Sequence, residues 1–482
     1  MKIRLFAIVI VLVAGGCGPH GSPTARSFWG SEYEGKTKFA SAEAELARIE
    51  IPTPVVTYAL DNGLRVIQHA DHRSPFVAVL VEYDVGAFDD PKGQPGLAHL
   101  TEHLLFRGSR NVQDGAFMRD LKGVGGADIN ATTKVETTVY METVPANQLE
   151  LALWMESDRL AFPFERLDAA SFAAEKGVVK NELLDREDVA YSRIGEMILR
   201  AVYPPGHPYH DWPTVQDKVA VLDKLRLEDV RSFFRDHYGP NHATMVLVGD
   251  IENQHTKALV TKYFAALPSR SALVKTKVPL DIRVNQPTTL HIVANVPAPM
   301  LILAWPTISI YAPGDAELDV LSTLMASHVG QLGSIVTNQY KIATLFKAQQ
   351  FSERFGGMFM LQMALKSSAD FERALEASDA ALERLRNNPP PVDLTTYARF
   401  PWMMKLLFRT ESLYGKGFYF LSYLRSTRDP RYLSRDLARY AAVDRDSLQD
   451  AARFFLDKEH RVVAMVTPMA GAPIGGELEI QP

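Results

Sequence analysis

Two histidines and a glutamate lie within five residues of an otherwise apolar stretch, GLAHLTEHLLFRGS, at residues 96–109. On a helix His99 and His103 share one face, with their Cβ atoms about 5–6 Å apart. This spacing allows two imidazoles to bind one tetrahedral ion, and Glu102 lies close enough to the same face to contact a water on the metal. The alternative is a helix with two structural histidines and a solvated glutamate. Because the chain has only 13 histidines in 482 residues, the clustering favours a metal site.

A catalytic zinc ion usually has three protein ligands and one open position, so a third ligand is required. The predicted helix AAEKGVVKNELLDRED contains Glu175 and Glu182, which are seven residues apart. Seven residues are nearly two helical turns, so both carboxylates face the same way. One can bind the ion while the other orients a histidine or the water. Taken alone, such a pair is more often part of a solvated helix face.

Together these segments resemble the M16 family of zinc peptidases, the inverzincins, whose signature is H-x-x-E-H. The family includes pitrilysin, insulysin and the mitochondrial processing peptidase. The resemblance rests on HLTEH, on EKGVVKNE about 80 residues later, and on three further stretches: GGADINATTKVETTVY, YPPGHPYHDWPTVQDKVAVL and HYGPNHATMVLVGDI. It is close over about residues 52–269 and faint over the rest. The length of the chain is similar to that of short members with two domains, which act as pairs of chains.

The resemblance implies a zinc metalloendopeptidase that hydrolyses peptides or unfolded protein segments. The implied Zn²⁺ ligands are His99, His103 and Glu182. Glu102 would be the general base for a zinc-bound water, and Glu175 the carboxylate that supports the site from behind. Asn130 and Ala131 would lie on an edge strand that holds the substrate backbone by strand addition.

One part of the family pattern is missing. Active members carry an arginine in the second domain and a tyrosine seven residues later, and in SIVTNQYKIATLF these positions align with Val336 and Ala343. Arg425 and Tyr432 have the right separation, but they are predicted to lie in a proline-containing loop. The resemblance therefore implies a partner, a second M16-like chain that supplies the pair. Two alternatives stay open: a non-catalytic structural or peptide-binding subunit, and an envelope assembly factor for which Glu102 is dispensable.

The predicted fold is α+β, with two related domains, each a mostly antiparallel sheet with helices packed on one side. Strand, strand and helix follow one another at residues 56–105, and the same order recurs after residue 286. We expect a zinc-bearing N-terminal domain at residues 52–269, a linker at 270–285 and an inactive C-terminal domain at 286–472. In PPGHPYHDWP, we expect His207 and His210 to be structural rather than a second metal site.

The N-terminus reads MKIRLFAIVIVLVAGGC, a basic start followed by an apolar run that is too short to span a bilayer. Residues 1–17 are predicted to be a signal peptide with a lipobox, and Cys17, the only cysteine, to be the lipidated residue. The alternative is an ordinary cleaved signal. Residues 18–51 resemble a tether. The expected location is the bacterial cell envelope, lipid-anchored in the outer membrane and facing the periplasm.

The overall charge is nearly balanced, with 52 basic and 57 acidic residues and a net charge of -5. No long basic block is present, so nucleic acid is not an expected partner. The hydrophobic content of 46% and the charged content of 23% are typical of a globular protein.

Overall fold

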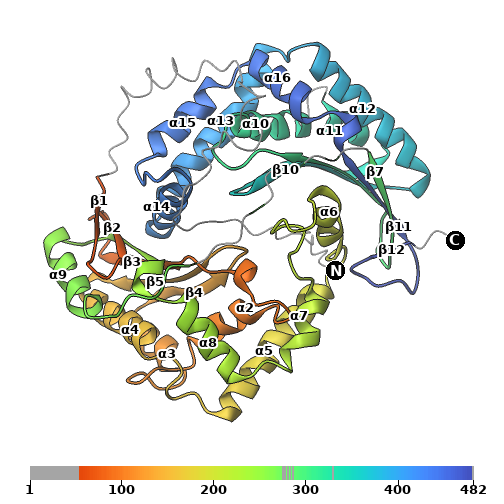
Figure 1. Ribbon diagram of the computed structural model, residues 1–482. Helices are drawn as coiled ribbons and strands as arrows, with labels where there is room; N and C mark the ends of the chain where they lie inside the picture. The colour runs from red at the N-terminus through yellow and green to blue at the C-terminus, as the bar shows by residue number, and fades with distance from the viewer. Residues whose placement is uncertain are drawn as a thin grey trace, which may run out of the picture.

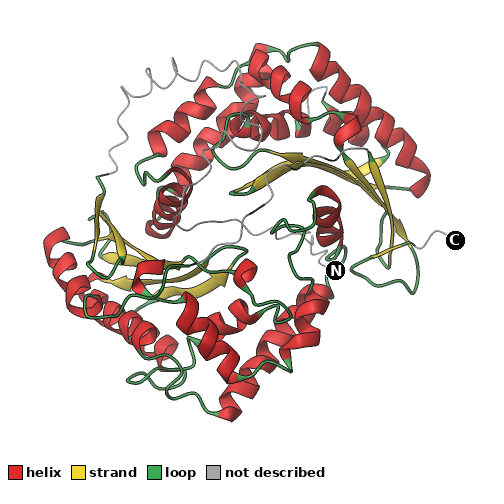
Figure 2. Cartoon of the chain, in the orientation of Figure 1, coloured by secondary structure: helices red, strands yellow, loops and turns green. Residues whose placement is uncertain are grey.

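The computed structural model describes residues 54–273, 278, 282, 284, 287–327 and 331–479. The predicted signal peptide, Cys17 and tether lie outside the described residues, as does much of the expected linker. Residues 54–273 are called the N-terminal half below, and residues 287–479 the C-terminal half. Each half contains one six-stranded sheet with its own helices on the outside (Figures 1 and 2).

The first sheet has the strand order β1-β2-β6-β3-β5-β4, and all neighbours are antiparallel except β2 and β6. Its strands are β1 (Val56–Ala59), β2 (Arg65–Ala70), β3 (Phe76–Tyr83), β4 (Ala127–Thr133), β5 (Thr138–Pro145) and β6 (Ala243–Gly249). The helices of this half are α2 (Leu97–Leu104), α3 (Ala116–Gly123), α4 (Leu149–Ala161), α5 (Ala169–Glu187), α6 (Ile194–Val202), α7 (Val215–Leu222), α8 (Leu227–His237) and α9 (Asn253–Phe264).

Local sequence explains several of these elements. The hairpin of β1 and β2 turns at Gly63, whose φ of +91° suits glycine, and a Cβ there would lie 2.7 Å from Asn241. Strand β3 is apolar because both of its faces are covered, and seven of its eight residues are buried. β3 therefore lies at the centre of the sheet, next to β6, all of whose residues are buried.

The second sheet has the order β12-β7-β11-β8-β10-β9, in which only β7 and β11 are parallel, and its strands β7 to β11 repeat the arrangement of β2 to β6. Its strands are β7 (Thr288–Ala294), β8 (Met300–Thr307), β9 (Ala343–Glu353), β10 (Gly356–Leu365), β11 (Val462–Pro468) and β12 (Glu477–Leu478). The helices are α10 (Asp315–Ala326), α11 (Leu332–Ser334), α12 (Phe371–Asn387), α13 (Val392–Arg409), α14 (Leu413–Thr427), α15 (Leu433–Ala442) and α16 (Arg445–Phe455). The two-domain α+β prediction is confirmed, and β12 lies beyond residue 472.

The two halves exchange one helix each, which the sequence did not predict. Helix α6 packs on the second sheet through Ile194, Ile198 and Val202, and α14 packs on the first sheet through Phe420 and Leu421. Helices were expected on one side of each sheet. Apart from the exchanged helix, each half places its own helices on one face of its sheet, and the helix from the other half packs on the opposite face (Figure 1). Among the described residues, every helix is too short or too polar to traverse a lipid bilayer.

Buried ion pairs attach α14 to the first sheet. Arg425 pairs with Glu82 on β3, and Lys416 pairs with Asp71, which follows β2. All four side chains are at most 11% exposed. The structure corrects the expectation that Arg425 lies in a loop, because it lies in the last turn of α14. Arg425 joins the two halves at this position.

A second junction forms where the β9–β10 hairpin meets the loop after α6. His207 donates from Nε2 to the Phe355 carbonyl at 3.1 Å, and Tyr203 donates its hydroxyl hydrogen to the Gly357 carbonyl at 2.8 Å. The Tyr209 N–H donates to His207 Nδ1 at 3.2 Å. Both ring nitrogens of the fully buried His207 are therefore occupied, which supports the structural role expected for it and leaves no nitrogen for a metal.

Acid is expected to weaken this junction. Burial lowers the pKa of His207 to about 4, well below the value of about 6.5 in an unfolded chain. The unfolded state therefore binds the proton more readily, so stability that is present above pH 6.5 is lost as the pH falls towards 4. In urea titrations at pH 7.5 and pH 4, the free energy of unfolding of the wild type should fall by about 3 kcal/mol more than that of His207→Gln. Equal pH dependence of the two proteins would contradict this assignment.

Candidate metal centre

Helix α2 carries the H-x-x-E-H motif and is fixed at its first turn by Asp90. The Asp90 carboxylate accepts from the N–H groups of Gly96 at 2.6 Å and Ala98 at 2.7 Å, so it satisfies donors that a helix N-terminus leaves unpaired. Gly96 has a φ of +89°, a left-handed conformation that suits glycine. The sequence interpretation missed Asp90, although the polar DDPKGQPG run before the helix contains the signal.

The apolar side of α2 sets the direction of its histidines. Leu97, Leu100 and Leu104 are fully buried in the core of the N-terminal half. Their three- and four-residue spacing places them on one helix face, so His99 and His103 point to the other face. There they meet α5, whose residues Val179 and Leu183 are buried in the same core.

Three predicted ligands converge between these helices. The Glu182 Oε2 atom lies 3.2 Å from His103 Nε2 and 3.7 Å from His99 Nε2. The three donor atoms all lie within 4.8 Å of one another. Ligand atoms around a tetrahedral Zn²⁺ are separated by about 3.3–3.5 Å, given metal–ligand bonds of about 2.0–2.2 Å. The arrangement therefore fits a zinc ion with small side-chain adjustments, and two imidazoles with one carboxylate form a donor set typical of catalytic zinc.

Glu175 supports this group from behind. Its Oε1 accepts from His103 Nδ1 at 2.9 Å, and its Oε2 lies 3.2 Å from Nε of Arg107. The hydrogen bond keeps a proton on Nδ1 and turns Nε2 of His103 towards Glu182. Glu182 in turn pairs with Arg186 through its other oxygen. The two carboxylates that the sequence placed on one helix face thus have separate positions, one among the candidate ligands and one behind His103.

Glu102 lies beside the candidate ligands and is 7% exposed. Burial raises the pKa of its carboxyl group, while the Thr133 hydroxyl donates to Oε2 at 2.5 Å and favours the charged form. Thr133 ends strand β4, so it ties the position of Glu102 to the edge of the sheet. Thr133 lies in the segment GGADINATTKVETTVY, but its position in the sequence does not indicate this contact.

The charges of the group favour a cation at its centre. Its hydrogen bond to His103 lowers the pKa of Glu182 to about 2. Burial opposes protonation of His103, but hydrogen bonds to Glu175 and Glu182 prevail and raise its pKa to about 9. Burial lowers the pKa of His99 to about 3, which keeps it neutral and able to bind a metal. Without a metal, the imidazolium of His103 supplies the positive charge that the two carboxylates require.

Removing the supporting carboxylate is expected to weaken metal binding without abolishing it. In Glu175→Gln the neutral amide accepts the Nδ1 hydrogen bond less strongly, so His103 becomes a poorer ligand. We expect zinc affinity to fall about 10–100-fold, measured by competition with a chelating indicator. Glu187→Gln on the same helix is the control and should bind zinc as the wild type does. An unchanged affinity for Glu175→Gln would show that Glu175 does not orient His103.

Asn130 and Ala131 lie on β4, the edge strand next to this group. Among the described strands, β4 is the last of the first sheet and pairs only with β5. Both residues line the same cleft as His99, His103 and Glu182, together with the side chain of Glu102. The cleft has a volume of about 610 Å³. An extended peptide that adds to this edge would pass beside the candidate metal ligands.

The positions expected for the arginine and tyrosine carry apolar side chains in the core of the C-terminal half. Val336 is fully buried in a short π-helical turn (Ile335–Gln339), and Ala343 is 3% exposed at the start of β9. Neither lines the cleft. Tyr432, which has the right separation from Arg425, packs against Tyr311 and Tyr423 within the C-terminal half.

Known families match both halves. Residues 65–206 match the family described as "Insulinase (Peptidase family M16)", and residues 224–399 match "Peptidase M16 inactive domain". Together these matches cover well over half of the chain. The chain belongs to the M16 family of zinc peptidases.

Individual relatives are similar in sequence and in fold. The zinc protease PqqE of Helicobacter pylori is 30% identical over 217 residues, which cover 43% of this chain and 46% of that relative. The match thus spans less than half the length of the curated protein. The crystal structure of a protease from H. pylori superposes with a TM-score of 0.76 at 22% identity, covering 86% of this chain and all of that one. The periplasmic protease PqqL from Escherichia coli gives a TM-score of 0.73 at 17% identity, covering 88% of this chain and 50% of that one. Both structures share this fold.

Proposed function

We propose that this protein is a zinc metalloendopeptidase that hydrolyses peptides or unfolded protein segments. The observation that carries the proposal is the convergence of His99, His103 and Glu182, with Glu102 beside them and Glu175 behind. Zinc bound there would polarise the scissile carbonyl and make the attacking water more acidic. An intact set of this kind, in a family whose relatives are named zinc proteases, favours an enzyme over a subunit that has lost its site.

In this proposal the residues of the chain have distinct tasks. Glu102 accepts a proton from the attacking water and later passes it to the leaving amine. The Thr133 hydroxyl holds the Glu102 carboxylate in place, and Glu175 holds His103. The open edge of β4, at Asn130 and Ala131, binds the substrate backbone in an extended conformation.

We further propose that a second M16-like chain supplies the missing arginine and tyrosine. Support comes from Val336 and Ala343, which stand where the pair aligns and are buried in the core. The same observation favours the second candidate function, a non-catalytic structural or peptide-binding subunit. The location proposed from the N-terminal sequence is the bacterial cell envelope, with a lipid on Cys17 that anchors the protein in the outer membrane, facing the periplasm. The periplasmic relative in E. coli is consistent with that compartment.

Metal analysis and peptide cleavage test these proposals together. The purified chain should contain about one zinc per molecule, and it should cleave unstructured peptides strongly only when co-purified with an M16-like chain that carries the arginine and tyrosine. Full activity of the isolated chain would refute the partner proposal and leave the peptidase proposal intact. A chain that binds no zinc and cleaves nothing, alone or with that partner, would support the non-catalytic subunit.

A further inference from the structure

The metal cleft contains a basic side chain that has no internal partner. Outside the histidines and glutamates of the metal centre, the charged residues that line the cleft are Arg107, Arg186 and Lys218, all of them basic. Arg107 lies 3.2 Å from Glu175, and Arg186 pairs with Glu182. Within the described part of the chain, Lys218 forms no hydrogen bond or ion pair through its Nζ atom. Once a divalent zinc ion occupies the centre, the cleft carries more positive than negative charge.

The acidic residues that attract Lys218 from a distance are Asp90, Glu196 and Asp217. None of them forms an ion pair with it among the described residues, and two of them already serve other donors. Both carboxylate oxygens of Asp90 accept backbone N–H groups at the start of α2. Asp217 accepts from the backbone N–H of Thr214 at 2.9 Å. The three N–H donors of the Lys218 ammonium group are therefore available to an acceptor from outside the chain.

The position of Lys218 is set by packing of its stem. Lys218 belongs to α7, and its Cγ atom lies against the start of α2, where a Cβ on Gly96 would be only 3.4 Å away. Burial lowers the pKa of Lys218, because the protein around it solvates an ammonium group less well than water does. A substrate carboxylate at this position would supply the stabilisation that the surrounding residues do not.

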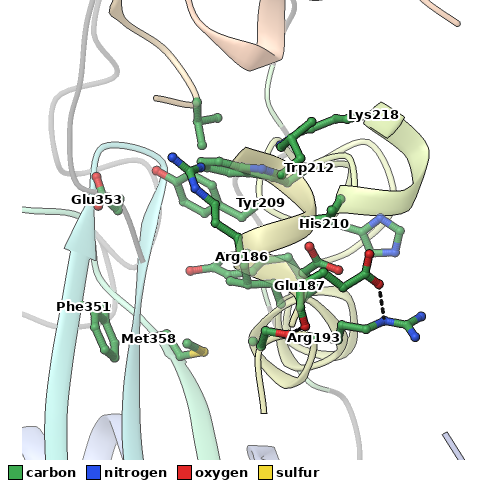
Figure 3. A pocket seen from close by; sticks show the side chains of 18 of the residues that line it. Arg186, Glu187, Arg193, Tyr209, His210, Trp212, Lys218, Phe351, Glu353 and Met358 are labelled. Carbon is green, nitrogen blue, oxygen red and sulfur yellow. Dashed lines mark hydrogen bonds and ion pairs between the residues drawn. The ribbon is translucent and has the colours of Figure 1, made fainter. Parts of the chain in front are cut away.

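Lys218 lies towards one end of the strand edge on which a substrate would bind. The part of β4 that lines the cleft runs from Ile129 to Thr133. Thr133, Trp212 and Lys218 also line a second pocket of about 470 Å³ beside the metal cleft, whose walls come from both halves (Figure 3). Ile129 and Met118 line the cleft alone. A peptide strand on β4 would therefore pass Lys218 at the Thr133 end.

We propose that Lys218 binds an acidic side chain of the substrate, aspartate or glutamate, at one position close to the scissile bond. The proposal rests on the proposed peptidase function, because it assumes a substrate strand along β4. The ammonium group matches a carboxylate, whereas a neutral amide is a weaker acceptor and a basic side chain is repelled. Lys218 then selects the substrate and takes no part in the reaction itself. A hydrogen bond to a charged group of this kind favours glutamate over glutamine by about 10–100-fold.

Three substitutions isolate the charge of Lys218. Lys218→Met removes the charge but keeps an unbranched stem that can pack against Gly96. Lys218→Arg keeps the charge. Lys224→Met is the matched control, because Lys224 is an exposed lysine just after α7 that does not line the cleft. The zinc content and melting temperature of each variant are recorded to confirm that it is folded.

The experiment is a glutamate scan. Fluorescently labelled peptides of twelve residues, amidated at the C-terminus so that no terminal carboxylate competes, carry one glutamate or one glutamine at each position in turn. The background is alanine, serine and glycine. Binding is measured by fluorescence anisotropy on the full-length chain with Glu102→Gln, so that no peptide is cleaved. The kcat and KM values for the same peptides are then measured with Glu102 in place, with and without a co-purified M16-like chain.

We expect one position at which glutamate binds at least about tenfold tighter than glutamine. Lys218→Met should remove most of this preference, whereas Lys218→Arg and Lys224→Met should retain it. A scan with no preferred position, a preference that survives in Lys218→Met, or no binding of any peptide would overturn the proposal. An equal fall in kcat for glutamate and glutamine peptides in Lys218→Met would also overturn it, because Lys218 would then act in the reaction. Selective binding without cleavage by any combination of chains would refute the peptidase function and leave the role of Lys218 standing.

Discussion

Replacing Glu102 with glutamine is expected to lower peptide cleavage by a factor of about 10²–10⁴, while the zinc content stays near that of the wild type. The amide has the same shape and can still accept from the Thr133 hydroxyl, so the fold around the site is preserved. It cannot take a proton from the attacking water, so the proposed general base is lost. Glu102 is not among the three side chains that converge as candidate ligands, which is why activity and metal content should separate.

The measurement is the initial rate of cleavage of an unstructured peptide, with zinc determined on the same samples. Glu228→Gln, an exposed glutamate on α8, is the control and should retain full activity. If Glu102→Gln cleaves at the wild-type rate, Glu102 is not the base. If Glu102→Gln loses its zinc as well, Glu102 also has a structural role in the site that its observed contacts do not indicate.

Replacing Arg425 with methionine is expected to lower the free energy of unfolding by about 3–5 kcal/mol. Its partner Glu82 is 3% exposed on β3, where burial raises the pKa of the carboxyl group to about 7, even with the arginine beside it. Without the guanidinium, a buried carboxylate loses its main compensating charge, and the carboxyl group must take up a proton at neutral pH. The loss should appear as a lower midpoint in urea titration.

Two further variants show whether this loss of stability comes from the ion pair between Arg425 and Glu82. Arg119→Met removes an arginine that is 66% exposed and paired with a neighbouring exposed aspartate, so its effect should stay below about 1 kcal/mol. The double variant Arg425→Met with Glu82→Gln removes both charges and should recover much of the lost stability. If the double variant is as unstable as Arg425→Met alone, packing of the arginine stem rather than its charge attaches α14 to the sheet.

The elements around the site were predictable because their signals are local. The three- and four-residue spacing of leucines in α2 determines which way His99 and His103 point, and the seven-residue spacing on α5 aligns Glu175 with Glu182. The edge position of β4 followed from the family resemblance, and the repeated strand order predicted the second sheet. For the two helices, the information lies in the local sequence of each helix.

The contacts between the halves were not predictable, because they join residues that are far apart in sequence. The Arg425–Glu82 pair links positions separated by 343 residues, and His207 reaches a carbonyl 148 residues away. A lone arginine near a proline, or two histidines in a proline-rich loop, has no periodicity that reveals such a partner. The pocket beside the metal cleft was missed for the same reason, since its walls come from segments of both halves.

The exchange of α6 and α14 limits what can enter the molecule. Moving the two halves far enough apart to admit a folded protein would expose the apolar surfaces of both sheets that α6 and α14 cover. It would also break the buried ion pair between Arg425 and Glu82. If the chain is a peptidase, as proposed, we expect it to act only on polypeptides that are narrow enough to enter between the halves without separating them.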